Sequence, residues 1–293
     1  ETGVGSDRVE RGVRTSAELS ASVGGAGGWA EHAVRNAVAV DLPEAQLPAD
    51  PYLLGVWLAA GQPGEARVSV TDEELVMRLE GLGLEVEPVA RTGHEAVVHA
   101  GGLPLDDPHV PAEYLRAAPA QRRALLAGLL DAGGSVAEDG QVRFTTGNAR
   151  VRAGVYELAV SLGLRVTVTR RESRGRHAAS PTTWTLGFIT SEEVFTLPGA
   201  QLWHKECTPV GSAAETHRFV VAVRPVPTVP VRCVQIAHPE HLYLAGWAMV
   251  PTHNSTVGLD IARSAAIHHG QAAVIFSLEM TRTEITMRLL SAE

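Results

Sequence analysis

The feature that most constrains the fold of this chain is an internal duplication between about residues 38 and 198. The apolar stretch LLGVWLAAG at 53–61 matches LAGLLDAGG at 126–134 in register. Each stretch is followed by an alternating, strand-like segment, at 67–70 in one copy and at 141–144 in the other. Two equal units predict two similar substructures related by a pseudo-twofold axis.

An amphipathic helix follows the strand in each copy. In the first, Thr71 and Glu74 have the spacing of a capping box, and in the second, Asn148 can cap the helix. The apolar positions at helical spacing are Leu75, Val76, Leu79 and Leu82 in the first helix and Val151, Val155, Leu158 and Leu162 in the second. Both helices end in Leu-Gly-Leu before further strand, so each copy reads helix–strand–helix–strand.

These residues resemble the LAGLIDADG (DOD-type) homing endonucleases, which are found inside many inteins. In that family, the two motif helices pack side by side through small residues, and here these are Gly55 and Gly128. The resemblance implies a pseudo-twofold α+β domain over residues 38–200. It also implies that the ancestral partner of this domain is double-stranded DNA.

The resemblance further implies an acidic residue at the eighth position of each motif, where the carboxylate holds a divalent metal beside a DNA phosphate. These positions are Ala60 and Gly133, and neither has a carboxylate. Asp131 lies two residues before Gly133, and on a helix that displacement turns it toward another face. A solvated or capping aspartate is the alternative interpretation of Asp131. The sequence therefore supports the endonuclease fold and argues against nuclease activity.

A second group of reactive residues lies nearer the C-terminal end, at His253-Asn254-Ser255. The Asn254 side-chain amide can attack its own backbone carbonyl and break the following peptide bond. His253 can donate a proton to the departing amine, and the Ser255 hydroxyl can carry an ester intermediate. Together these residues have the chemistry of protein splicing.

The preceding residues favour the same interpretation, because 231–236 and 241–246 both read as strands. The block resembles the C-terminal splicing block of inteins and implies a partial β (Hint-type) splicing domain at 201–254 that needs no cofactor. In that block, Cys233 falls where the family has an Asp or Cys that assists the chemistry, and His241 falls on its internal His. An inert buried thiol and a strand-end histidine are the alternatives.

The segment after Asn254 combines a helical pattern at 255–266 with an apolar run at 272–276 that is typical of a buried parallel strand. It resembles DnaB-type replicative helicases and implies a short RecA-like α/β fragment at 255–293. Ser255 and Thr256 match the end of the phosphate-binding loop, where the serine hydroxyl binds Mg²⁺ of ATP. Glu279 matches the glutamate that polarises the attacking water, with a solvated carboxylate as the alternative. By this resemblance, the helicase binds DNA and forms a hexamer.

Composition narrows the remaining choices. A formal net charge of −8 argues against tight nonspecific DNA binding, and two cysteines fit a reducing cytoplasm. No apolar run reaches the roughly 20 residues of a membrane span. Residues 1–37 contain a glycine-rich tract and no N-terminal splicing block, so we expect a flexible remnant and a separate N-terminal intein segment as partner. The cluster at 204–207 has too few ligands for a zinc site.

Three hypotheses follow. The first is a self-processing intein segment joined to part of a helicase, the second is a site-specific endonuclease, and the third is a working ATP-dependent helicase. The absence of acids at Ala60 and Gly133 argues against the second. The absence of the glycine and lysine part of the phosphate loop argues against the third, so this chain alone is expected to be inactive as an ATPase.

Overall fold

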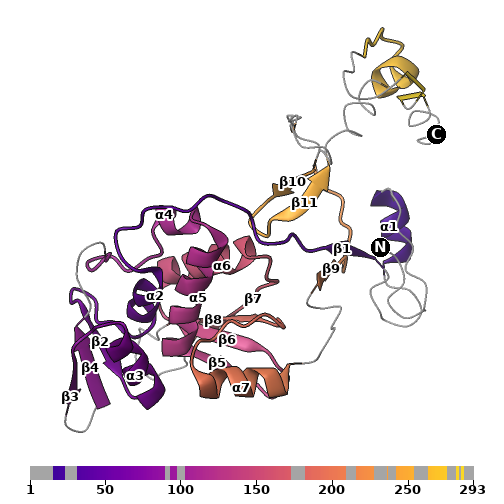
Figure 1. Cartoon of the computed structure of the whole chain (residues 1–293). Helices are drawn as coiled ribbons and strands as arrows, with labels where there is room; N and C mark the ends of the chain where they lie inside the picture. Colours follow the sequence, from indigo (N-terminus) through magenta and orange to yellow (C-terminus); the bar gives the residue numbers. More distant parts are fainter. Residues whose placement is uncertain are drawn as a thin grey trace.

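The computed structural model describes residues 16–23, 32–89, 93–97, 103–172, 182–208, 216–227, 236, 242–253, 263–275, 282–283 and 285–286. The two copies of the duplication form the main body, and two short two-stranded sheets, β1-β9 and β10-β11, lie beside it (Figure 1). No helix among these residues is both long enough and apolar enough to cross a membrane.

The first copy has two helices and one antiparallel sheet with the strand order β2-β4-β3. Its elements are α2 (Pro51–Ala60), β2 (Arg67–Val70), α3 (Glu73–Gly81), β3 (Val86–Val89) and β4 (Gly93–Val97). An isolated bridge between Gly61 and Val68 extends this sheet beside β2.

The second copy repeats this order with longer elements, and its sheet has the order β5-β6-β8-β7. Its elements, after the connecting helix α4 (Ala112–Leu115), are α5 (Pro119–Gly133), β5 (Gly134–Val136), β6 (Val142–Thr146), α6 (Ala149–Ser161), β7 (Thr167–Glu172) and β8 (Thr182–Phe188). Strands β6, β8 and β7 correspond to β2, β4 and β3, and β5 corresponds to the isolated bridge. The predicted pseudo-twofold repeat is therefore present.

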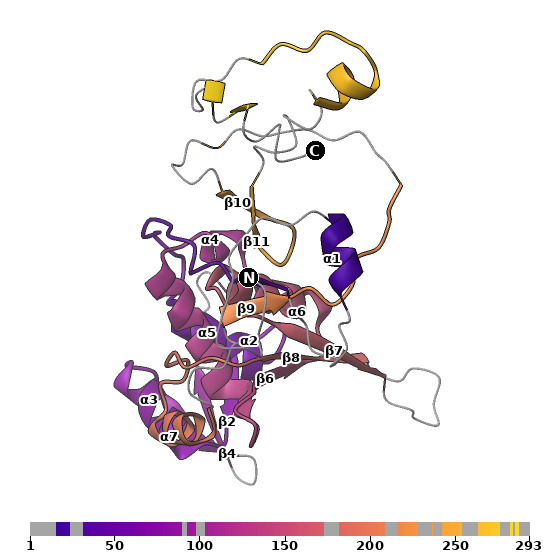
Figure 2. The same cartoon turned by 90° about the vertical axis from the view of Figure 1, so that its right-hand side faces the viewer.

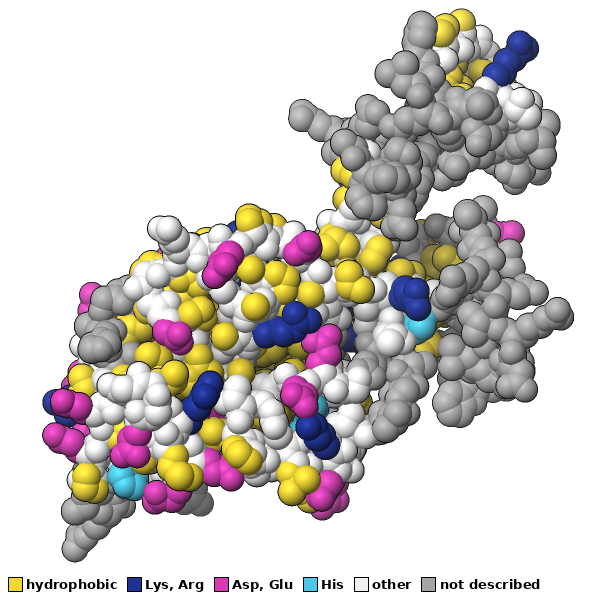
Figure 3. All heavy atoms as spheres, viewed as in Figure 1, with side chains coloured by type: hydrophobic (Ala, Val, Ile, Leu, Met, Phe, Trp, Pro, Cys, Tyr) yellow, Lys and Arg dark blue, Asp and Glu magenta, His cyan; other side chains and the backbone are white. Residues whose placement is uncertain are grey.

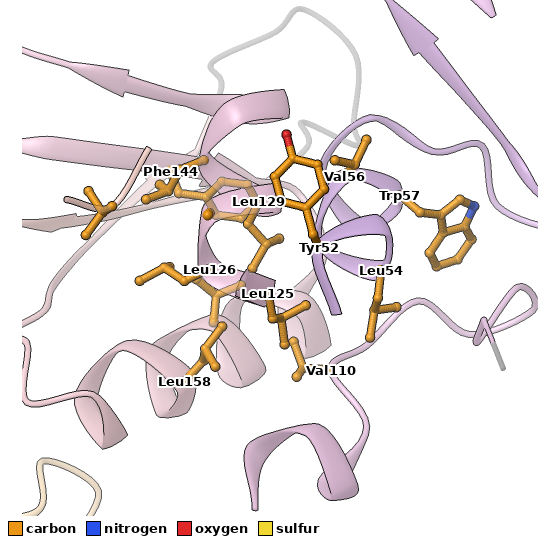
Figure 4. Packing of buried hydrophobic residues seen from close by; sticks show 14 of the residues in the cluster. Tyr52, Leu54, Val56, Trp57, Val110, Leu125, Leu126, Leu129, Phe144 and Leu158 are labelled. Carbon is orange, nitrogen blue, oxygen red and sulfur yellow. The ribbon is translucent and has the colours of Figure 1, made fainter. Parts of the chain in front are cut away.

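The two copies meet along helices α2 and α5, as the small motif residues predict. A Cβ added to Gly55 would lie 2.3 Å from the carbonyl oxygen of Leu125, and one added to Gly128 would lie 2.0 Å from that of Tyr52. Only glycine allows the two backbones to approach this closely. Figure 4 shows the core around this seam, to which Leu54 and Val56 of α2 and Leu125, Leu126 and Leu129 of α5 contribute.

Matching caps begin the second helix of each copy. The Asn148 side chain accepts from the amides of Arg150 and Val151, as predicted. In the first copy the prediction of Thr71 was wrong by one residue, because Asp72 is the cap and accepts from the amides of Glu74 and Leu75. A carboxylate one residue nearer the helix reaches two free N–H groups, which explains the shift.

Each of these helices also ends in the same way, with a glycine in the left-handed region. The φ angles are 83° at Gly83 and 89° at Gly163. Leu82, predicted as part of the buried face, is instead 41% exposed, and Leu84 beyond the turn is buried. The glycine reverses the chain there, so that Leu84, and not Leu82, occupies the core position.

The predicted boundaries on either side of the main body differ from the structure. Helix α7 (Pro198–Cys207), most of which was assigned to the splicing domain, packs on the main body: the Gly199 amide donates to Glu74, and Trp203 Nε1 donates to the Val136 carbonyl. Residues assigned to a flexible remnant form α1 (Ser16–Ser22) and β1 (Ala33–Arg35). β1 pairs in antiparallel fashion with β9 (His217–Phe219).

A buried arginine fixes the chain that enters the main body. Arg122 of α5 is fully buried and donates to the carbonyls of Ala117, Ser161 and Val40 and to the Ser161 hydroxyl. Burial is the largest cause that lowers the pKa of this guanidinium. Its partners tie residues near 40 to the end of α6.

The C-terminal segment departs from the prediction of a parallel strand. Residues 271–275 have no regular structure, and Val274 is 75% exposed. A parallel strand needs a neighbour for its hydrogen bonds, and no described residue pairs with this one. The described part of this segment contains one short π-helix, η1 (Ser264–His268), and the four described residues at 282–283 and 285–286 are helical.

Candidate functional site

The ends of the two motif helices lie together, and they lack acidic side chains at the eighth motif positions. Helix α2 ends at Ala60 and helix α5 at Gly133. A Cβ on Gly133 would lie 3.1 Å from the Ala59 Cβ and 3.3 Å from Cε2 of the buried Phe144. Within the described part of the chain, no group of three or more His, Cys, Asp or Glu residues could hold a metal ion. The helix ends thus meet in a contact of Gly133 with Ala59 and Phe144, and no carboxylate stands at either eighth motif position.

Asp131 is neither a solvated nor a capping aspartate, so the alternative interpretation was wrong. Its carboxylate accepts from the Tyr52 hydroxyl at 2.9 Å, from the Thr196 amide at 3.0 Å, and from the Thr196 hydroxyl. Burial, with the nearby negative charge of Asp131 as a smaller cause, raises the pKa of Tyr52 above its ordinary range. Asp131 therefore joins both motif helices to the segment before α7. Nothing in the sequence around Thr196 signals this role.

The sheet of the second copy has an outer face without acidic residues. Across β5, β6, β8 and β7 the register places these outward-facing residues together: Ser135, Arg143, Thr145, Thr167, Thr169, Arg171, Thr183, Thr185 and Gly187. The opposite face, with Val142, Phe144 and Leu186, is buried against the helices. Hydroxyl and guanidinium groups both donate hydrogen bonds to phosphate oxygens.

The corresponding face of the first copy has the opposite character. Glu87 and Glu95 stand directly opposite each other on β3 and β4, and Arg67 of β2 makes a 3.2 Å ion pair with Glu95. On the face of the main body seen in Figure 3, basic and acidic side chains are mixed, and no large basic patch is visible. A phosphate backbone would meet repulsion at the first copy's sheet.

Residues 242–253 form a hairpin of β10 (Leu242–Ala245) and β11 (Val250–His253), so a strand is confirmed over 242–245 of the segment predicted at 241–246. His253 ends β11 and pairs with Leu242. The last residue of the hairpin is therefore the one directly before Asn254 in the chain. The other predicted site residues lie outside the described residues: Cys233, His241, Asn254, Ser255, Thr256 and Glu279.

The sequence cluster at the end of α7 does not gather as a metal site. His204 is buried with its ring 5.8 Å from that of Phe195, and burial lowers its pKa. Burial and the neighbouring Glu206 and Glu138 raise the pKa of Cys207. His204 is therefore part of the packed core beside Phe195.

The paired motif helices and duplicated sheets define a LAGLIDADG-type domain, and the family described as "Homing endonuclease" matches residues 109–186. Among solved structures, the fold resembles mesophilic variants of the homing endonuclease I-DmoI (16% identity) and its complex with DNA and Ca (17%). Each likeness has a TM-score of 0.36 and covers 52% of this chain and 94% of the other.

Relatives in sequence are replicative helicases. The chain is 45% identical over 262 residues to replicative DNA helicase DnaB of Mycobacterium intracellulare, which covers 89% of this chain and 45% of that protein. It is 65% identical over 72 residues to DnaB of Mycobacterium leprae, covering 25% of this chain and 12% of the relative. DnaB of Leifsonia xyli matches over 39 residues at 64% identity, which is 13% of this chain and 8% of the relative.

The chain is therefore a homologue of DnaB replicative helicases that contains a LAGLIDADG homing-endonuclease domain. It spans less than half the length of these relatives.

Proposed function

We propose that this chain carries the C-terminal splicing block of an intein inserted in a DnaB-type helicase, and that its chemistry is cleavage at the Asn254–Ser255 bond. The single observation that carries the proposal is the β10–β11 hairpin, whose second strand ends at His253 directly before that bond. The extensive match to a DnaB helicase supports the insertion context.

The proposed reaction begins with the segment upstream of the intein held as an ester on Ser255 Oγ. The Asn254 side-chain nitrogen attacks the Asn254 carbonyl carbon, the bond to the Ser255 nitrogen breaks, and His253 supplies the proton that the leaving amine takes up. The products are a C-terminal succinimide and a free Ser255 amine, onto which the acyl group moves from oxygen to nitrogen. By resemblance, Cys233 and His241 assist, and no cofactor takes part.

In the spliced helicase, we propose that Ser255 and Thr256 complete the phosphate-binding loop, with the Ser255 hydroxyl on Mg²⁺ of ATP, and that Glu279 polarises the attacking water. The 39 residues matched in the Leifsonia protein equal in number those from Ser255 to Glu293, as expected for a relative without an insertion there. DNA unwinding by a homo-oligomer would then be the activity of the product.

A second candidate function is DNA contact through the outer face of the second copy's sheet. Arg143 and Arg171 with the surrounding threonines favour it. We expect this contact to be weak and salt-sensitive, because only two guanidinium groups face outward there. In fluorescence anisotropy with labelled duplex DNA, Arg143→Ala with Arg171→Ala should reduce binding, and Arg67→Ala should not. Equal DNA binding by the unmodified chain, the double variant and Arg67→Ala would exclude this second function.

Mass spectrometry of the purified full chain tests the splicing proposal. Asn254 cyclisation can also proceed slowly without the ester on Ser255, so we expect slow release of a fragment that begins at Ser255 from the chain alone, accelerated when an N-terminal intein segment is added. Asn254→Ala should abolish the release, His253→Ala should slow it, and Asn36→Ala should leave it unchanged as a matched control. Release that persists in Asn254→Ala would identify ordinary proteolysis and refute the proposal.

A further inference from the structure

The turn of the β10–β11 hairpin has an unusual backbone. Gly246 has a φ of 69°, which glycine adopts freely, and Met249 has a φ of 48°. Met249 is the one non-glycine residue with positive φ in the described part of the chain. A long side chain in that region is uncommon and persists where the surroundings hold it.

The Met249 side chain is held by the main body. It is half-buried and packs against the hydrophobic core of the duplicated domain, as does Tyr156 of α6. Trp247 of the same turn forms a groove of about 360 Å³ together with Arg152, Ala153, Tyr156 and Val168 of α6 and β7. Figures 1 and 2 both show this turn beside α6.

Neighbouring strands attach to the same side of the second copy. Arg165 Nη1 donates to the His217 carbonyl of β9 at 3.5 Å, and β1, the partner of β9, lies beside β11. Burial is the largest cause that lowers the pKa of Arg218, which lies within electrostatic reach of Tyr156 and Arg165. These strands therefore lie on the same side of the second copy as the hairpin turn, near Tyr156 of α6.

We infer that Met249 is a positioning residue: it anchors the hairpin on the endonuclease-like domain and thereby fixes β11, whose last residue precedes Asn254. A two-stranded hairpin is marginally stable alone, so an anchor at its turn decides how well its ends are held. Cyclisation needs the amide nitrogen near its carbonyl, and loss of that proximity slows the reaction. The role in catalysis rests on the proposed splicing function, whereas the anchoring does not. On this account, the domain that lacks the motif acids serves the junction as a platform.

Hydrogen exchange on the full chain tests the anchoring directly. In Met249→Ala, we expect amides of the 242–253 peptide to exchange about tenfold faster than in the unmodified chain, with the peptides of α5 unchanged. Met249→Gly removes the backbone strain as well as the side chain, so it should also exchange faster. Met77→Ala, a change at an exposed methionine on α3, is the matched control and should alter nothing in this peptide. Unchanged protection in Met249→Ala, or restored protection in Met249→Gly, would overturn the inference.

Release of the Ser255 fragment tests the consequence for chemistry. The Asn254-dependent rate should fall about fivefold in Met249→Ala, while its pH dependence keeps the shape set by His253. Faster exchange with an unchanged release rate would overturn the positioning role. If the unmodified chain shows no Asn254-dependent release, the splicing proposal fails by itself, and the exchange result still decides whether Met249 anchors the hairpin.

Discussion

The two copies of the duplicated domain share a backbone plan and differ in their surfaces. They meet at the same glycine-lined seam, and a cap and a left-handed glycine bound the second helix of each. The outward sheet faces differ: the first copy presents Glu87 and Glu95, and the second presents Arg143, Arg171 and a set of threonines. The match to homing endonucleases also falls in the second copy, because it begins at residue 109.

The residues that the fold needs differ from those that nuclease activity would need. The seam cannot change without a backbone clash, so both glycines are fixed by packing. The acids of the motif have no such role, and Ala60 and Gly133 fill their places without a carboxylate. The only motif carboxylate, Asp131, is one that the packing uses.

We expect the largest effect on stability from adding a side chain to the seam between α2 and α5. In Gly128→Ala, the new Cβ would lie 2.0 Å from a backbone carbonyl oxygen, so the helices must separate. We expect a loss of about 3 kcal/mol or more in the free energy of unfolding, measured by urea denaturation.

The matched control for this substitution is Gly81→Ala. Gly81 ends α3, and an added Cβ there meets no atom within 4 Å. It should stabilise the chain by up to about 1 kcal/mol. Similar losses for the two variants would mean that the seam is not the constraint.

Asp131→Leu makes the sixth motif position of the second copy like Leu58 of the first. Because the Thr196 amide and the Tyr52 hydroxyl lose their acceptor, we expect a loss of about 2–3 kcal/mol in unfolding free energy. Asp139→Ala removes an exposed aspartate that accepts one backbone amide, and it should cost less than about 1 kcal/mol. An unchanged free energy of unfolding in Asp131→Leu would show that Asp131 has no structural role.

Much of the main body could be predicted from the sequence because its determinants are local or periodic. The repeat located α2 and α5, Asn148 located a cap, and small residues located the seam. Contacts between distant segments carried no such signal. The bond from Thr196 to Asp131 and the pairing of β1 with β9 depend on where the chain returns in space.

The candidate site was predictable as chemistry rather than as geometry. The tripeptide at 253–255 led to a proposed reaction, which stays a prediction, and the structure adds the hairpin that precedes it. The anchor at Met249 could not be predicted, because a left-handed methionine has no sequence signature. Within the apolar run predicted at 272–276, the described residues 272–275 do not form a strand, because periodicity does not supply the neighbouring strand that a parallel ladder needs.

The contribution of the Tyr52–Asp131 contact to stability should depend on pH in the alkaline range. Burial raises the folded-state pKa of Tyr52. The contribution of neutral Tyr52 to the free energy of unfolding is therefore complete below the unfolded pKa of about 10, and it is lost as pH rises above that value. Tyr52→Phe should be less stable by about 1 kcal/mol at pH 8. We expect this gap to narrow between pH 10 and 12 in thermal unfolding. A gap independent of pH would contradict the account.

The smallest expected effect concerns the like charges of the first copy. Glu87→Gln removes the repulsion opposite Glu95 and should raise the unfolding free energy by about 0.2–1 kcal/mol. Thr169→Ser, on the matching strand of the second copy, is a control without a change in charge. A loss of stability in Glu87→Gln would show that the two carboxylates share a bound cation or an equivalent compensation.

The duplicated domain combines a glycine-lined helix seam with eighth motif positions that carry no carboxylate. The most direct measurement is incubation of the purified chain with Mg²⁺ and a plasmid that carries the uninterrupted helicase gene, followed by electrophoresis. We expect the plasmid to stay intact, because Ala60 and Gly133 offer no ligand for the metal. Site-specific double-strand cleavage that a plasmid without the gene does not undergo would contradict it.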